Sequence, residues 1–117
     1  YRKTSFEVLD AEYIIFYLNR QIYDNYGKSI KFISTIIIPD ERIVLINNKI
    51  LLLRSIVVHN KLNHYMAFFK CGNSWFLYND GPYREKGHTI KYIGKYTDLI
   101  NTKEYNPIDH GILFFYM

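Results

Sequence analysis

The feature that most constrains the fold of this chain is the stretch at residues 65–80, where two aromatic runs flank a short polar segment. The runs are residues 65–69 and 75–78, and the segment between them contains Gly72-Asn73. Aromatic residues favour pleated, half-buried surfaces, and a Gly-Asn pair readily adopts the positive φ that a tight reversal requires. The pattern therefore predicts a β-hairpin whose loop lies near residues 71–74.

The register of this hairpin determines which side chains share a face. A register in which Lys70 lies opposite Trp75 also pairs Phe68 with Leu77 and Met66 with Asn79. Because side chains alternate along a strand, one face then carries His64, Met66, Leu77 and Asn79, and the other carries Tyr65 and Asp80. His64 and Asn79 become diagonal neighbours on adjacent strands, close enough for their side chains to meet. An imidazole beside a carboxamide is the arrangement that gives a general base its orienting partner.

Length and composition indicate one globular domain spanning residues 1–117. The chain is 49% hydrophobic and 18% aromatic, which is typical of a β-rich protein with a real core and excludes a disordered chain. Its longest apolar runs, residues 13–18 and 50–53, are far shorter than the ~20 residues that cross a bilayer, so we expect no membrane contact. The first residue is not Met and no signal-peptide pattern follows it, so we expect a domain taken from a longer chain.

The cysteine count indicates the compartment of the protein, and its amino-acid bias indicates its source. One cysteine excludes an internal disulfide framework and suits a reducing compartment, so we expect an intracellular location, cytoplasmic or nuclear. Heavy use of Ile, Asn, Lys and Tyr is typical of AT-rich coding, which suggests a viral or protist source.

The net charge of +4 is spread along the chain rather than gathered. No run reaches the 5–8 basic residues that mark a nucleic-acid patch. We therefore expect an ordinary solvated surface, with weak binding to an acidic partner as the alternative.

The remaining segments are predicted from composition and turn signals. Residues 4–10 resemble a helix start, residues 24–27 and 47–48 are turns, residues 80–88 and 101–110 are loops, and residues 96–100 form a helical turn. Strands are predicted at residues 13–18, 30–38, 42–46, 50–58, 89–94 and 111–117, with residues 50–58 central in the sheet. The predicted fold class is α+β, mainly antiparallel β-sheet with one or two short helices.

Five segments of the chain occur in the same order as segments of a known protein family. They are residues 13–20 (YIIFYLNR), 56–60 (IVVHN), 64–68 (HYMAF), 75–80 (WFLYND) and 113–116 (LFFY). They resemble the second half of the catalytic domain of ubiquitin-specific proteases, papain-like cysteine peptidases that remove ubiquitin. The corresponding family segments are a strand ending in L-K-R-F, a histidine box V-V-H-S…G-H-Y-T-A-Y, a W-Y-x-F-D/N-D strand and a closing L-F-Y strand. The resemblance spans roughly residues 11–117 and implies the fold of that C-terminal half.

The resemblance implies a role for three residues. His64 falls where the family has its general base, and Asn79 falls where an Asp or Asn orients the imidazole. Asp80 is the next acidic position, which the family often uses to support catalysis. The chemistry is that of a thiol peptidase, because a neutral histidine accepts the thiol proton and its partner fixes the tautomer.

The chain also departs from the family pattern. The family's nucleophilic cysteine begins a helix upstream of the first matching strand, and these residues contain no such segment. The only thiol, Cys71, lies at the predicted hairpin tip, too far from His64 at ~3.3 Å per residue. Asn63 replaces the glycine before the base, where its side chain would obstruct a substrate tail, and the zinc-binding cysteines of many members are absent.

Simpler interpretations of these residues stay open. A lone histidine among strand aromatics is more often a hydrogen-bonded polar residue than a base, so His64 has a structural alternative. Residues 79–82 all favour turns, and the aromatic cluster at residues 75–78 is typical of a core. The four histidines and the single thiol match no standard ligand spacing, so we expect no metal and no cofactor.

Three functions are compatible with these observations. The first, which the missing nucleophile and Asn63 favour, is a non-catalytic domain of this family that binds a protein partner, either ubiquitin-like or a further copy of itself, or serves a structural role. The second is the C-terminal half of an active deubiquitinating peptidase whose nucleophile lies outside these residues. The third, a basic β-domain that binds nucleic acid through aromatic stacking, rests on charge and aromatic content alone.

Overall fold

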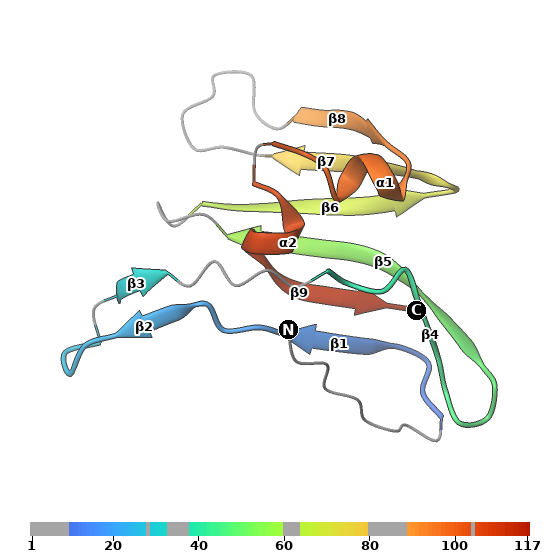
Figure 1. The fold of residues 1–117 in the computed structure, drawn as a ribbon, viewed down its shortest axis with the longest axis horizontal. Coiled ribbons are helices and arrows are strands. Elements are labelled where there is room, and N and C mark those ends of the chain that lie inside the picture. The colour runs from blue at the N-terminus through green and yellow to red at the C-terminus, as the bar shows by residue number, and fades with distance from the viewer. Residues whose placement is uncertain (1–9, 28, 33–37, 60–63, 80–88, 104) are drawn as a thin grey trace.

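A computed structural model describes residues 10–27, 29–32, 38–59, 64–79, 89–103 and 105–117 (Figure 1). The strands are β1 (Ile14–Tyr17), β2 (Gln21–Tyr23), β3 (Ser29–Phe32), β4 (Arg42–Val44), β5 (Ile50–His59), β6 (Tyr65–Cys71), β7 (Ser74–Asn79), β8 (Thr89–Gly94) and β9 (Gly111–Tyr116). The helices are α1 (Tyr96–Leu99) and α2 (Pro107–His110). The predicted class, a mainly antiparallel sheet with two short helices, is confirmed.

A seven-stranded antiparallel sheet organises the molecule. Its strands follow the order β1-β9-β5-β6-β7-β8, with β4 paired to β5, while β2 and β3 form a separate two-stranded sheet. β5 is the longest strand and pairs with β6, β9 and β4, so its predicted central place is confirmed. Its Leu, Ile and Val residues suit a strand that has neighbours on both edges.

The predicted hairpin is present as β6 and β7. Lys70 pairs with Trp75 and Phe68 with Leu77, the register expected from the sequence. Gly72 has φ of +62° and Asn73 is not among the positive-φ residues, which is the pattern of a type II′ turn. The two-residue loop therefore fixes the pairing of every residue back to the open ends of both strands.

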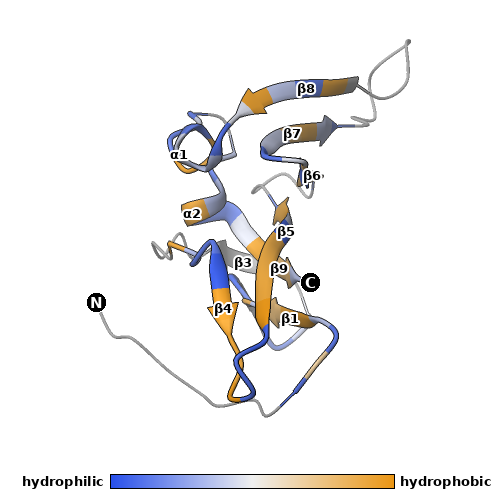
Figure 2. Cartoon of the chain, turned by 90° about the vertical axis from the view of Figure 1, so that its right-hand side faces the viewer, coloured by the Kyte–Doolittle hydropathy of each residue, from blue (hydrophilic) through white to orange (hydrophobic). Residues whose placement is uncertain are grey.

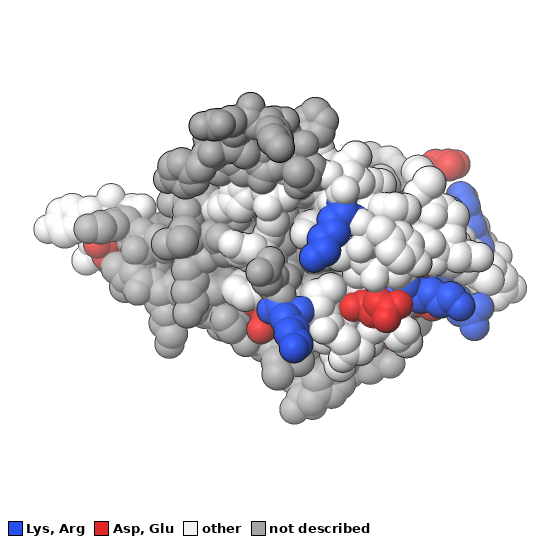
Figure 3. Space-filling model, turned by 90° about the horizontal axis from the view of Figure 1, so that it is seen from above, with Lys and Arg blue, Asp and Glu red and all other residues white. Residues whose placement is uncertain are grey.

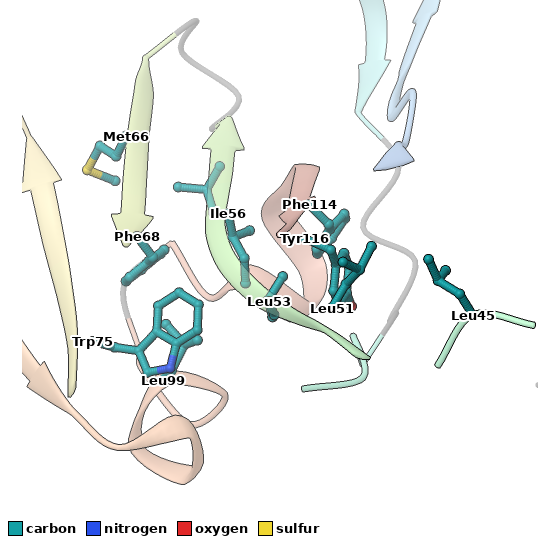
Figure 4. Close-up of a cluster of buried hydrophobic side chains, with 11 residues drawn as sticks. Leu45, Leu51, Leu53, Ile56, Met66, Phe68, Trp75, Leu99, Phe114 and Tyr116 are labelled. Carbon is teal, nitrogen blue, oxygen red and sulfur yellow. The ribbon is translucent and has the colours of Figure 1, made fainter. Parts of the chain in front are cut away.

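The core lies on one face of the sheet. Figure 4 shows side chains from β5, β6, β7 and β9 converging there, joined by Leu99 of α1 and by Leu45, which follows β4. Figure 2 shows both helices and β4 on the same side of the sheet. Phe68, Ile56 and Trp75 are fully buried, as expected for strand residues that alternate toward a core.

Two segments differ from the sequence-based expectation. Residues 101–110, predicted as a loop, contain α2, which begins at Pro107 with Asn106 as its N-cap. No strand is predicted before the turn at residues 24–27, yet Gln21–Tyr23 form β2. The turn itself is present, and the Gly27 N–H donates to the Asp24 carbonyl. The predicted helix at residues 4–10 and loop at 80–88 lie outside the described residues, apart from Asp10, which is not helical.

Candidate functional site: the His64–Asn79 pair

His64 and Asn79 meet at the open end of the β6–β7 hairpin. His64 directly precedes β6, and Asn79 is the last residue of β7. The imidazole Nε2 lies 2.8 Å from the carboxamide Oδ1, although 15 residues separate the two along the chain. The predicted proximity of these side chains is therefore confirmed, and the catalytic role that the resemblance implies for them stays a prediction.

This hydrogen bond determines which tautomer the neutral His64 ring adopts. An amide oxygen only accepts, so Nε2–H donates to Asn79 Oδ1. In a neutral imidazole the proton-accepting lone pair then belongs to Nδ1. His64 is partly buried, and this hydrogen bond fixes the orientation of its ring. A ring fixed in this tautomer is suited to take a proton from a group that approaches Nδ1.

A second histidine lies at the end of the neighbouring strand β5. His59, the last residue of β5, pairs in register with Tyr65, the first residue of β6. Their rings stack with centroids 4.2 Å apart and planes only 6° from parallel, and His59 is 3% exposed. The stack holds the backbone immediately next to His64. The sequence does not predict this stack, although it does show a histidine at the end of the apolar strand 50–58.

Neither Asp80 nor Cys71 is shown to join the His64–Asn79 pair. Asp80 lies outside the described residues, so its supporting role stays a prediction. Cys71 is exposed at the far end of β6, and the seven residues of that strand, at ~3.3 Å each, separate it from His64 by roughly 20 Å. Cys71 cannot transfer a proton to His64 within one chain.

A shallow pocket lies on the same face of the sheet as the pair. Its volume is ≈ 390 Å³, its apolar lining includes Phe68, Leu77 and Ile93, and Lys91 and Lys103 are among its polar residues. Leu77 is on β7, two positions before Asn79, so the pocket approaches the pair without including it.

The described residues offer no alternative centre of metal chemistry. They contain no group of three His, Cys, Asp or Glu side chains arranged to hold a metal ion. In the same part of the chain, no helix is both long and apolar enough to cross a membrane. Figure 3 shows Lys and Arg side chains separated from one another, with acidic residues among them, on the surface seen from the β8 side.

Comparison of the chain with protein-family models found no match, and comparison with curated proteins found none either.

Proposed function

We propose that this domain is the base-bearing half of a thiol-dependent peptidase similar to the ubiquitin-specific proteases. The single observation that carries the proposal is the 2.8 Å hydrogen bond from His64 Nε2 to Asn79 Oδ1. A general base needs an imidazole held with its lone pair on Nδ1, and this bond supplies that orientation. The same bond would also fasten the open end of the hairpin in a non-catalytic module, so the labelling experiment below separates the two.

The proposed chemistry needs a cysteine from polypeptide outside residues 1–117. His64 Nδ1 takes the proton of that thiol, and the resulting thiolate attacks the carbonyl carbon at the end of a ubiquitin-like tail. The imidazolium that forms is stabilised by Asn79, and it then gives its proton to the departing amine. The acyl group is left as a thioester, which water hydrolyses in a second step.

A labelling experiment on the full-length gene product tests this proposal. A ubiquitin with a C-terminal electrophile is expected to form a covalent adduct through the thiol that His64 activates. Replacing His64→Ala should slow labelling by about 10²–10⁴-fold, the usual contribution of a general base. The matched control is Cys71→Ser, which should label at the parent rate because that thiol is remote and exposed. No adduct in the parent protein, or an adduct lost with Cys71→Ser, would overturn the proposal.

A second candidate, the non-catalytic protein-binding module, is favoured by a different observation. Tyr65 follows His64 directly and is 53% exposed, and further aromatic residues are exposed across the same face of the sheet. Aromatic residues are enriched in protein interfaces. This candidate predicts that ubiquitin binding, measured by titration calorimetry, survives His64→Ala but is weakened by Tyr65→Ser.

A further inference from the structure

The face of the sheet opposite the core is apolar, and we call it the open face. Register places on it Ile15 and Tyr17 of β1, Phe115 of β9, Phe76 of β7, and Ile90 and Tyr92 of β8. Side chains alternate in a strand, so these residues point away from the buried set that includes Phe68 and Trp75. Both faces of this sheet are therefore apolar.

Exposure shows that the described elements leave the open face uncovered. Ile15, Tyr17, Ile90 and Tyr92 are 51%, 68%, 61% and 62% exposed, at the two opposite edges of the sheet. Between them, aromatic rings contact one another across the strands, as Phe76 does with Tyr92 at a centroid separation of 5.6 Å. The apolar side chains between the two edges are half-buried, and an apolar face with exposed residues at both edges is typical of an interaction surface.

The open face is also almost free of charge. The strands β1, β9, β5, β6, β7 and β8 contain only Arg54, Lys70 and Lys91 as charged residues. Lys70 pairs with Trp75 and Lys91 with Leu77, which places both lysines on the core-side face. Arg54 lies at the β5 bulge and donates to the Met117 carbonyl at the end of the sheet. Arg42 of β4 pairs with Leu52, whose neighbours Leu51 and Leu53 are buried, so Arg42 lies on the open-face side at that same end of the sheet. The other described positions of the open face carry no Lys, Arg, Asp or Glu, although the chain as a whole is +4.

We propose that the open face is the interface of a symmetric homodimer, in which two copies of this chain pack open face against open face. A two-fold axis brings each patch against itself, so a charged patch would repel its own copy and an uncharged one does not. Two sheets packed in this way form a sandwich with the spacing of ~10 Å that aligned sheets adopt.

The area of the open face is close to the area that each subunit of a dimer buries. Strands ~4.8 Å apart and residues ~3.3 Å apart give the face a projected area on the order of 600 Å². That is the upper limit of the apolar patches of about 300–600 Å² that monomers expose. It is also comparable to the ~800 Å² that each partner contributes to a standard interface. A second copy covers the whole face without further polypeptide.

Sedimentation equilibrium of the chain at 1–100 μM tests the proposal, with a dimer as the expected species. Tyr17→Lys and Tyr92→Lys each place two lysines in the symmetric interface and are expected to raise the dimer dissociation constant by about 10²-fold or more. Both tyrosines are more than half exposed, so the variant monomers are expected to fold, which circular dichroism checks.

The matched control is Tyr26→Lys, which makes the same substitution at a 95% exposed residue in the turn after β2. This variant should dimerise as the parent does. A parent chain that stays monomeric at 100 μM overturns the proposal, and so does a dimer that tolerates both Tyr17→Lys and Tyr92→Lys. Neither result bears on the His64–Asn79 pair, because the proposed dimer does not depend on it.

Discussion

Gly72 determines where the β6–β7 hairpin reverses, and therefore where His64 lies relative to Asn79. Its φ of +62° is strained for residues with a Cβ, whereas glycine adopts it freely. A shift of the loop by one residue would change the pairing all along both strands and turn one member of the pair to the opposite face. The chemistry at one end of the hairpin therefore depends on a residue at the other end.

Gly72→Ala is expected to lower the free energy of unfolding by about 1 kcal/mol, measured by urea denaturation. A Cβ at this position would meet no heavy atom within 4 Å, so the cost comes from the backbone alone. Asn73→Ala, the neighbouring exposed position without positive φ, serves as the control and should be close to neutral. Equal stability of the Gly72 variant and the parent would show that the turn conformation is not as described.

At the scale of elements, Arg20 joins the end of β1 to the junction of α2 and β9. Its Nε donates to the Gly111 carbonyl at 2.7 Å, and its Nη2 donates to the Ile108 carbonyl at 3.0 Å. The side chain is almost fully buried, and this burial lowers the pKa of the guanidinium, while nearby Asp109 acts in the opposite sense. The Arg20 side chain thus donates hydrogen bonds to carbonyl groups at the end of α2. A helix of only four residues is not stable without such tertiary contacts.

Replacing Arg20→Met keeps much of the apolar stem and removes both hydrogen bonds, so we expect a loss of about 2–4 kcal/mol in the free energy of unfolding. The reason is that the Gly111 and Ile108 carbonyls lose a charged donor in a buried place. A control is Lys49→Met, whose ion pairs with Asp10 and Glu12 are long and solvent-exposed and should contribute less than 1 kcal/mol. Similar losses for the two variants in chemical denaturation would be incompatible with an anchoring role for Arg20.

The elements differ in how well the sequence predicts them. The β6–β7 register follows from two aromatic runs and a Gly-Asn pair, because local turn chemistry and side-chain alternation agree there. The helix α2 was missed although Asn106 accepts a hydrogen bond from the Ile108 N–H and Pro107 occupies the first helical position, which together are a helix-start signal. So short a helix depends on contacts with Arg20, which lies far away in the sequence.

The sequence predicts one part of the candidate site and not the other. The proximity of His64 and Asn79 follows from the hairpin alone, so the sequence was sufficient for it. The stacking of His59 on Tyr65 requires β5 to lie beside β6, a pairing that no local pattern specifies. The aromatic open face was also not predicted, because which side of the sheet is covered depends on where α1, α2 and β4 pack.

At the scale of the whole molecule, two tyrosines tie the segment before β4 to the rest of the fold. Tyr116 donates to the Asp40 carbonyl at 2.6 Å, and Tyr96 donates to the Pro39 carbonyl. Burial raises the pKa of Tyr116 above its ordinary value of 10.0, and nearby Asp40 and Tyr96 raise it further. Burial, with Glu41 and Asp40, also raises the pKa of Tyr96.

These shifts predict alkaline instability. Above pH 10 the unfolded chain releases the Tyr116 proton while the folded chain retains it, so the stability that is complete below pH 10 is lost as the pH rises. The slope is up to about 1.4 kcal/mol per pH unit for this group. Urea denaturation between pH 8 and 12 measures it.

The variant Tyr116→Phe should be about 1 kcal/mol less stable at pH 8, because the hydrogen bond to Asp40 is lost. Its stability should then decline less steeply than that of the parent above pH 10. Tyr26→Phe, at a 95% exposed position, should follow the parent. Parallel curves for Tyr116→Phe and the parent would exclude Tyr116 as the source of the alkaline decline.

The orientation of the His64 ring by Asn79 is the feature on which the proposed chemistry depends, and imidazole ¹⁵N NMR of the chain measures it most directly. We predict that the neutral form of the His64 imidazole carries its proton on Nε2 and its lone pair on Nδ1, and that Asn79→Ala gives a mixture of tautomers. A proton on Nδ1 in the parent protein, or a tautomer that Asn79→Ala leaves unchanged, would contradict the assignment of His64 as a base held by Asn79.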